Sequence, residues 1–255
     1  EADPADLFPK VCGYDISTRI TVVLDNTINP AGLSRKYHIE GIEHNWDRHD
    51  QWTTRWQLWD VNQYYTTLAV HTDSVYARGA SANYAVIQAQ AAGDATRPDA
   101  DTHYVANWNY VPGECEIERT VFYFDLSQIV ATSVTSARLY YYVADKSAPA
   151  VDFTMSVVPG ISVSQPLVVA DYGVLGDANA IYGSILNSAT TIGGYNYIDL
   201  NATGLGYIWA CTGGICELAL RMDNDINAVP VSDNRQSVVG LTGGAKPKLI
   251  IGVEL

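Results

Sequence analysis

Two runs of apolar and aromatic residues near the middle of the chain, Thr120–Phe124 and Ala137–Val143, predict a pair of strands. Val, Phe and Tyr at this density favour a pleated strand over a helix. The polar segment between the runs, Asp125–Ser136, is long for a hairpin loop. We therefore expect the chain to cross here between the two sheets of a sandwich.

Short strand-like runs continue towards the C-terminus and are separated by Gly, Pro, Asp and Asn. They are Asp152–Val158, Tyr197–Leu200, Glu217–Met222, Gln236–Leu241 and Lys248–Val253. Many short strands with turn residues between them predict an all-β fold, an antiparallel jelly-roll-like β-sandwich. Between the strands, Ser81–Gln90 fits either a helix or a strand, and we expect a loop at Asp171–Ala180 and one helical turn at Leu205–Trp209.

The first part of the chain predicts a small β-domain of its own. Its strand-like runs are Val11–Ile16, Arg19–Leu24, Tyr37–Glu43 and Gln51–Asp60, after a polar arm at Glu1–Lys10. We interpret Gln63–Val70 as a connection. The expected domains are residues 1–70, for anchoring to an assembly, and residues 71–255, for recognition of a surface or ligand. Because the chain does not begin with Met, we expect Glu1 to be a processed end or the edge of a longer polypeptide.

The composition is apolar enough for a core and strongly acidic. Apolar residues make up 47% of the chain, and 15 Lys and Arg stand against 28 Asp and Glu, a net charge of −13. A chain this acidic repels nucleic acid and anionic membranes, so we expect no nucleic-acid partner. No apolar run reaches the ~18 residues of a membrane-spanning helix, so we expect no insertion into a membrane.

Two of the four cysteines, Cys211 and Cys216, flank a Gly213-Gly214 pair. If the glycines form a two-residue hairpin turn, the cysteines face each other with Cα atoms ~4.5 Å apart, within disulfide range. We predict this disulfide, which is typical of an oxidising location. The alternative is two buried thiols, and the pairing of Cys12 and Cys115 stays open.

The polar residues after Glu217–Met222 offer several hard oxygens close together. A structural Ca²⁺ would be bound there by Asp223, Asn224, Asp225 and Asn227. The alternative is an ordinary turn, and Asp171, Asp177 and Asn179 form a weaker cluster. No nucleophile elbow, P-loop or zinc-protease motif is present. The carboxylates Asp99, Asp101, Asp223 and Asp225 could be nominated as catalytic, but we expect no enzyme.

Sugar binding uses exposed aromatic faces beside hydrogen-bonding side chains. The aromatic residues at the edges of predicted loops are the candidates for glycan contact: Trp108, Tyr110, Tyr172, Tyr182 and Tyr195. The alternative for each ring is the core or the packed surface of a sheet, because the chain has 17 tyrosines.

The order RITVVL, YHIEGIEHNWD and WTTRWQLWDVN, over Thr18–Asn62, resembles the C-terminal portion of minor tail or tail hub proteins of tailed bacteriophages. This resemblance implies a small β-domain with a scaffolding role inside a larger assembly.

A second resemblance covers Arg119–Leu255. The segments RTVFYFDLSQI, TSARLYYYV, YIDLNATGLGYI, ELALRM and AKPKLIIGVEL follow one another as in the jelly-roll modules known as DNRLRE-like domains, which resemble carbohydrate-binding modules. This similarity implies the fold more firmly than the function.

Together these features predict a structural and attachment protein of a phage tail or a similar extracellular assembly, located in the virion or outside the cell. Its partners would be other subunits, further copies of itself and a cell-surface polysaccharide. One alternative is a carbohydrate-binding module of a secreted polysaccharide-degrading enzyme. Another is the subunit of an extracellular filament held by strand exchange.

Overall fold

The computed structural model describes residues 19–24, 33–46, 52–60, 62–98, 101–148, 152–230, 233–240 and 244–254. The chain divides into two units, residues 1–63 with 254–255 and residues 64–253. The predicted strand at Val11–Ile16 and the predicted arm lie outside the described residues.

The first unit contains a three-stranded antiparallel sheet in the order β1-β2-β3. Its strands are β1 (Arg19–Leu24), β2 (Leu33–Trp46) and β3 (Trp52–Asp60). Of the four strands predicted for this region, the three that lie in the described residues are confirmed, and β2 extends beyond its predicted bounds at both ends.

The second unit is built on one large antiparallel sheet. Its strands are β4 (Asn62–Ala80), β5 (Ala95–Pro98), β6 (Thr102–Val111), β7 (Glu114–Asp125), β8 (Ser133–Lys146), β9 (Thr154–Pro159), β10 (Gly183–Leu186), β11 (Gly194–Asp199), β12 (Ile215–Met222), β13 (Asp233–Val239) and β14 (Lys248–Glu254). The predicted connection at Gln63–Val70 is wrong, because these residues form the first part of β4. The segment has Tyr, Thr and Val but neither Gly nor Pro, which favours a strand.

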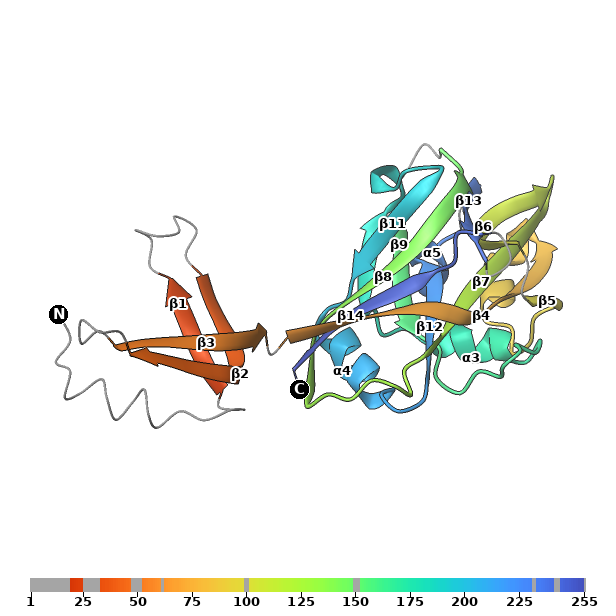
Figure 1. Ribbon diagram of the computed structural model, residues 1–255. Helices are drawn as coiled ribbons and strands as arrows, with labels where there is room; N and C mark the ends of the chain where they lie inside the picture. The colour runs from red at the N-terminus through yellow and green to blue at the C-terminus, as the bar shows by residue number, and fades with distance from the viewer. Residues whose placement is uncertain are drawn as a thin grey trace. The chain divides into compact units, whose positions relative to one another are not determined.

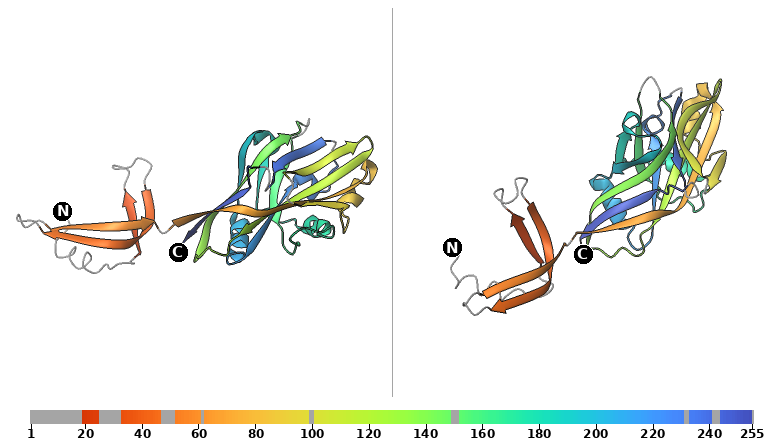
Figure 2. Two further views of the ribbon diagram at one scale, coloured as in Figure 1. Left: turned by 45° about the vertical axis from the view of Figure 1, so that its right-hand side comes forward. Right: turned by 45° about the horizontal axis from the view of Figure 1, so that its top comes forward.

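The strand pairing closes on itself. It runs from β7 through β6, β13, β8, β14 and β4, and β4 pairs again with β7. Strands β12, β9 and β10 extend this ring from β7, β11 extends it from β8, and β5 extends it from β4. Strands β8, β14 and β4 run side by side (Figure 1; Figure 2). The predicted all-β antiparallel sandwich is confirmed.

The central pair of predicted strands is confirmed in β7 and β8. In the described part of the chain β7 pairs with β4, β6 and β12 but not with β8. The segment between them is therefore not a hairpin loop, as its length predicted, but it joins two strands of the same sheet rather than two separate sheets. Every residue of β7 from Cys115 to Phe124 is buried, which is typical of a strand covered on both faces.

Short helices cover one face of the strands β4, β7 and β12. They are η1 (Ser81–Asn83), α2 (Tyr84–Gln88), α3 (Asp171–Asp177) and α5 (Asp223–Ile226). A buried cluster joins α2 and α3 to the sheet: Val75, Ala77, Tyr84, Ile87, Cys115, Ile117, Val121, Tyr123, Val158, Leu167, Tyr172, Leu175 and Ala219. The ambiguous Ser81–Gln90 is therefore mostly helical, and the loop predicted at Asp171–Ala180 contains α3.

The remaining helices are η2 (Asn187–Ala189) and α4 (Ala202–Ala210). Helix α4 is longer than the single turn predicted at Leu205–Trp209. Its start is fixed by Asn201, whose side chain accepts a hydrogen bond from the backbone N–H of Gly204 at 3.0 Å.

Within the described ranges, none of the helices has the length and apolar character needed to span a membrane.

Candidate functional site

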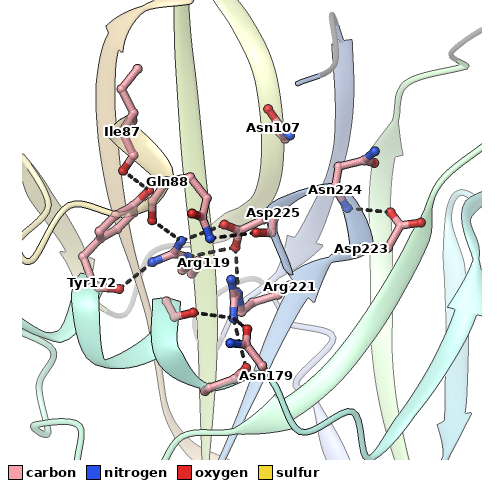
Figure 3. A network of polar contacts seen from close by, with 12 residues as sticks. Ile87, Gln88, Asn107, Arg119, Tyr172, Asn179, Arg221, Asp223, Asn224 and Asp225 are labelled. Carbon is pink, nitrogen blue, oxygen red and sulfur yellow. Dashed lines mark hydrogen bonds and ion pairs between the residues drawn. The ribbon is translucent and has the colours of Figure 1, made fainter. Parts of the chain in front are cut away.

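The arginine that opens the RTVFYFDL segment, Arg119, is fully buried on β7 (Figure 3). Its guanidinium donates to both carboxylate oxygens of Asp225, at 2.8 and 2.7 Å. It also donates to the carbonyl oxygens of Gln88, at 3.0 Å, and of Tyr172, at 2.5 Å. One side chain on β7 therefore binds the helices α2, α3 and α5.

A second buried arginine completes this network. Arg221 of β12 donates through Nε to Asp225 at 2.7 Å, and through Nη1 to the carbonyl oxygens of Gly176 and Ala178 (Figure 3). We call Arg119, Arg221 and Asp225 the arginine clamp. Burial favours the protonated form of Asp225, but the two guanidiniums outweigh it and lower the pKa of this carboxyl to about 2.

In this structure both oxygens of Asp225, one of the predicted calcium ligands, accept from arginine. The other predicted ligands have separate partners. Asp223 accepts from the backbone N–H of Asn224 at 2.9 Å, and the Asn224 side chain accepts from Asn234 at 3.0 Å. The Ca²⁺ site predicted at Asp223, Asn224, Asp225 and Asn227 stays a prediction.

Two of the tyrosines predicted to contact glycans are buried instead. Tyr172 has no exposed surface, stacks under the Arg119 guanidinium at 4.0 Å and donates its hydroxyl to the Ile87 carbonyl at 3.1 Å. Tyr182 is 5% exposed and packs on Tyr207 of α4, with ring centroids 5.1 Å apart. Both rings belong to the interior, because Tyr172 lies on the buried side of α3 and Tyr182 packs against α4.

Trp108 and Tyr110 belong to strand β6, but their side chains lie outside the described part of the structure. Their predicted contact with a glycan stays a prediction.

Tyr195 is the one predicted tyrosine that the structure places on the surface, and it is 43% exposed. It lies on β11, where it pairs with Tyr142 of β8, and two residues further Tyr197 pairs with Tyr140. The ring centroids in each pair are 5.6 Å apart. Successive residues of a strand point to opposite faces, so these four tyrosines share one face of the sheet.

Charged side chains surround the four rings. Arg138, beside Tyr140 on β8, forms two hydrogen bonds with the Asp199 carboxylate, at 2.5 and 3.1 Å, and its guanidinium lies 4.1 Å from the Tyr197 ring centroid. Lys248 of β14 places its ammonium 4.6 Å from the Tyr195 centroid. These seven residues are the outer tyrosine face: Arg138, Tyr140, Tyr142, Tyr195, Tyr197, Asp199 and Lys248.

The opposite side of the same two strands is core, which fixes the orientation of this face. Leu139, Tyr141 and Val143 of β8 are fully buried, and the side chain of Ile198 on β11 is only 1% exposed. A slip of one residue in either strand would expose this core, so the register is strongly specified. The outer tyrosine face is therefore a rigid surface of ring faces, hydroxyls and charges.

Sequence reasoning missed three of the four tyrosines because it considered only the aromatic residues at the edges of predicted loops. The signal was present in the alternation of RLYYYV and YNYID, where every second residue is Arg, Tyr or Asp. When large apolar residues alternate with residues that carry a polar group, the strand is predicted to have one buried face and one solvated face.

The predicted hairpin at Cys211 and Cys216 is wrong. Cys211 is the C-cap of helix α4, and Gly213-Gly214 belong to the turn that leads into β12. The two thiols are nonetheless in contact through a hydrogen bond, which lowers the pKa of Cys211 and raises the pKa of Cys216. Cys211 and Cys216 are free in this structure, and so is Cys115. The disulfide stays a prediction.

The buried carboxyl group of Glu118 has an unusually high pKa. Glu118 of β7 is 1% exposed, accepts from the Ser74 hydroxyl and lies 3.2 Å from the Arg97 guanidinium. Burial raises the pKa of Glu118 to about 7, although Arg97 and Ser74 oppose the shift. Because no part of this carboxyl reaches the surface, we interpret Glu118 as a structural residue.

Among the described residues, no group of three or more His, Cys, Asp and Glu side chains converges as a metal site would require. No protein-family model and no curated protein matches this chain.

Proposed function

We propose that this chain is a non-enzymatic structural and attachment protein of a phage tail or a similar extracellular assembly. Its second unit contacts cell-surface sugar chains through the outer tyrosine face. The observation that carries the proposal is the pair of cross-strand tyrosine contacts, in which Tyr195 and Tyr197 stay 43% and 47% exposed on a rigid sheet.

The chemistry of this face suits a polymer of sugar rings. The apolar side of a sugar ring packs on an aromatic face, while its hydroxyls need hydrogen-bond partners close by. The outer tyrosine face supplies four phenol rings together with the polar side chains of Arg138, Asp199 and Lys248. Because the rings are already held by the sheet, little side-chain entropy is lost on binding.

The assembly half of the proposal is supported by the resemblance of residues 18–62 to phage tail proteins. In this proposal the first unit anchors the chain to other subunits, including further copies of itself. The net charge of −13 favours partners other than nucleic acid.

The test is binding of the full chain to a panel of bacterial surface polysaccharides. The double variant Tyr195→Ala/Tyr197→Ala should weaken binding to its best ligand at least tenfold, about 1.4 kcal/mol, because two stacking surfaces are lost. The matched control is Trp209→Ala, since Trp209 is 40% exposed but lies on α4, outside the outer tyrosine face. Circular dichroism should show that all variants stay folded.

Equal binding by the double variant and the parent chain would refute the assignment of this face. The non-enzymatic part is tested in the same samples by measuring new reducing ends. Release of sugar fragments from a bound polymer would show that the chain is itself a hydrolase and refute this part of the proposal.

A further inference from the structure

Lys248 lies among the rings of the outer tyrosine face. It is the first residue of β14, the strand that runs beside β8. Its ammonium nitrogen is 5.1 Å from the ring centroid of Tyr140 on β8 and 4.6 Å from that of Tyr195 on β11. Contacts of this length with two rings are cation–π interactions, which place the positive charge between the two tyrosines.

This positive charge has no anionic partner among the residues that the structure describes. The nearby carboxylate of the face, Asp199, is already bound through both oxygens by Arg138. The ion pairs of the described residues involve other cations, and Lys248 forms none of them. The outer tyrosine face thus carries two cations and one anion, a local charge of +1 on a chain of net charge −13.

We propose that the sugar chains bound by the outer tyrosine face are anionic, and that Lys248 binds their carboxylate or phosphate group. This inference rests on the function proposed above. An ammonium has three hydrogen-bond donors and no acceptor, so a carboxylate or phosphate oxygen is its best partner. A neutral sugar would stack on the rings without using the charge.

The rest of the molecule makes this arrangement selective. An acidic protein repels a polyanion over most of its surface, and the repulsion is screened only beyond the Debye length. Binding of an anionic polymer is therefore favoured at the outer tyrosine face, where Lys248 lies beside the tyrosine rings. Arg138 adds a second cation at the far end of the tyrosine pairs, with its own charge balanced by Asp199.

The test compares polymers that differ in charge, with the full chain and its variants. The probes are polygalacturonate, the same polymer with its carboxylates methyl-esterified, and polyribitol phosphate. At least one of the two polyanions should bind, and the methyl ester should bind at least tenfold more weakly than polygalacturonate where the carboxylate is the ligand. Binding should weaken as salt is added.

Variants of Lys248 test whether its ammonium group binds the anion. Lys248→Met keeps the length of the side chain but should reduce polyanion binding by about tenfold, whereas Lys248→Arg should stay within about threefold of the parent. The matched control is Lys246→Met. It removes the same charge from an exposed side chain that forms no cation–π contact among the described residues, and it should leave most of the binding intact.

The outcomes separate this inference from the proposed function. If the methyl ester or another neutral polymer binds as tightly as the polyanions and Lys248→Met has no effect, the inference is overturned while the proposed function stands. If no polymer of either kind binds, both fail. Binding of polyribitol phosphate alone would identify the anion as phosphate, and binding of polygalacturonate alone would identify it as carboxylate.

Discussion

The buried charge of Arg119 has partners on three short helices that are distant in the sequence. Its donors bind Gln88 at the end of α2, Tyr172 on α3 and Asp225 on α5. A buried guanidinium without such partners would cost several kcal/mol. The arginine clamp therefore explains how a charged guanidinium is accommodated at this fully buried position of β7.

This geometry predicts a large effect when the anion of the arginine clamp is removed. Asp225→Asn keeps the shape of the side chain but leaves two buried guanidiniums without a counter-charge, so the free energy of unfolding should fall by about 3–5 kcal/mol. Asp223→Asn, on the same short helix, should cost less than about 1 kcal/mol, because Asp223 accepts only from a backbone N–H. Urea unfolding of both variants measures the difference, and equal losses would contradict the role of the clamp.

A second residue predicts a pH dependence. The pKa of Glu118 is about 7 in the folded chain, above its ordinary value of 4.5, because burial disfavours the charged form. Its protonated form is thus favoured by folding. The stability from this effect is fully present below pH ~4.5 and is lost as the pH rises through ~7.

The variant Glu118→Gln mimics the protonated acid at every pH. Between pH ~4.5 and pH ~7, its free energy of unfolding should therefore rise relative to that of the parent chain as the pH is raised. Outside this pH range the difference between the two should be constant. Chemical denaturation at a series of pH values gives this difference. A difference that does not change with pH would show that folding does not raise the pKa of Glu118.

At the scale of elements, the strands of the second unit were largely predictable, because alternation and turn residues are local properties of the sequence. Strands β7, β8, β12 and β14 all contain their predicted runs. The missed elements are short helices such as α3 and α5, which have too few residues for a helical pattern to be seen. Helices this short are held by tertiary contacts, here by the arginine clamp.

Helix α4 also corrects the interpretation of the cysteines. Asn201 is a residue type that is typical of a helix N-cap. The Gly213-Gly214 pair nevertheless favoured a hairpin more strongly than the residues before the pair favoured a helix. The thiols of Cys211 and Cys216 meet all the same, because the chain turns back directly after the helix ends.

This contact predicts that an oxidising glutathione buffer joins Cys211 to Cys216. The chain loses two hydrogen atoms, which convert one glutathione disulfide to two glutathione molecules. The bond should raise the free energy of unfolding by about 2 kcal/mol, because it closes a short loop in the unfolded chain. Mass spectrometry of peptides checks the bond, Cys211→Ser is the control, and two unreacted thiols after oxidation would contradict the prediction.

At the scale of the whole molecule, the fold class could be predicted but the candidate site could not. The outer tyrosine face combines β8, β11 and β14, and their pairing depends on contacts between residues more than fifty positions apart. Only Tyr195 of this face was predicted, because it stands beside a recognisable Gly193-Gly194 turn. The exposure of the other three rings depends on which side of each strand the core lies.

The most direct test of the account is oxidative footprinting of the full chain with and without its best-bound polysaccharide. Hydroxyl radicals modify exposed aromatic rings, so bound sugar should protect Tyr195 and Tyr197, the most exposed rings of the outer tyrosine face, and leave Trp209 equally reactive. Protection of these two tyrosines above all other described aromatics is the predicted result. Unchanged reactivity of both in a saturated complex would contradict the account.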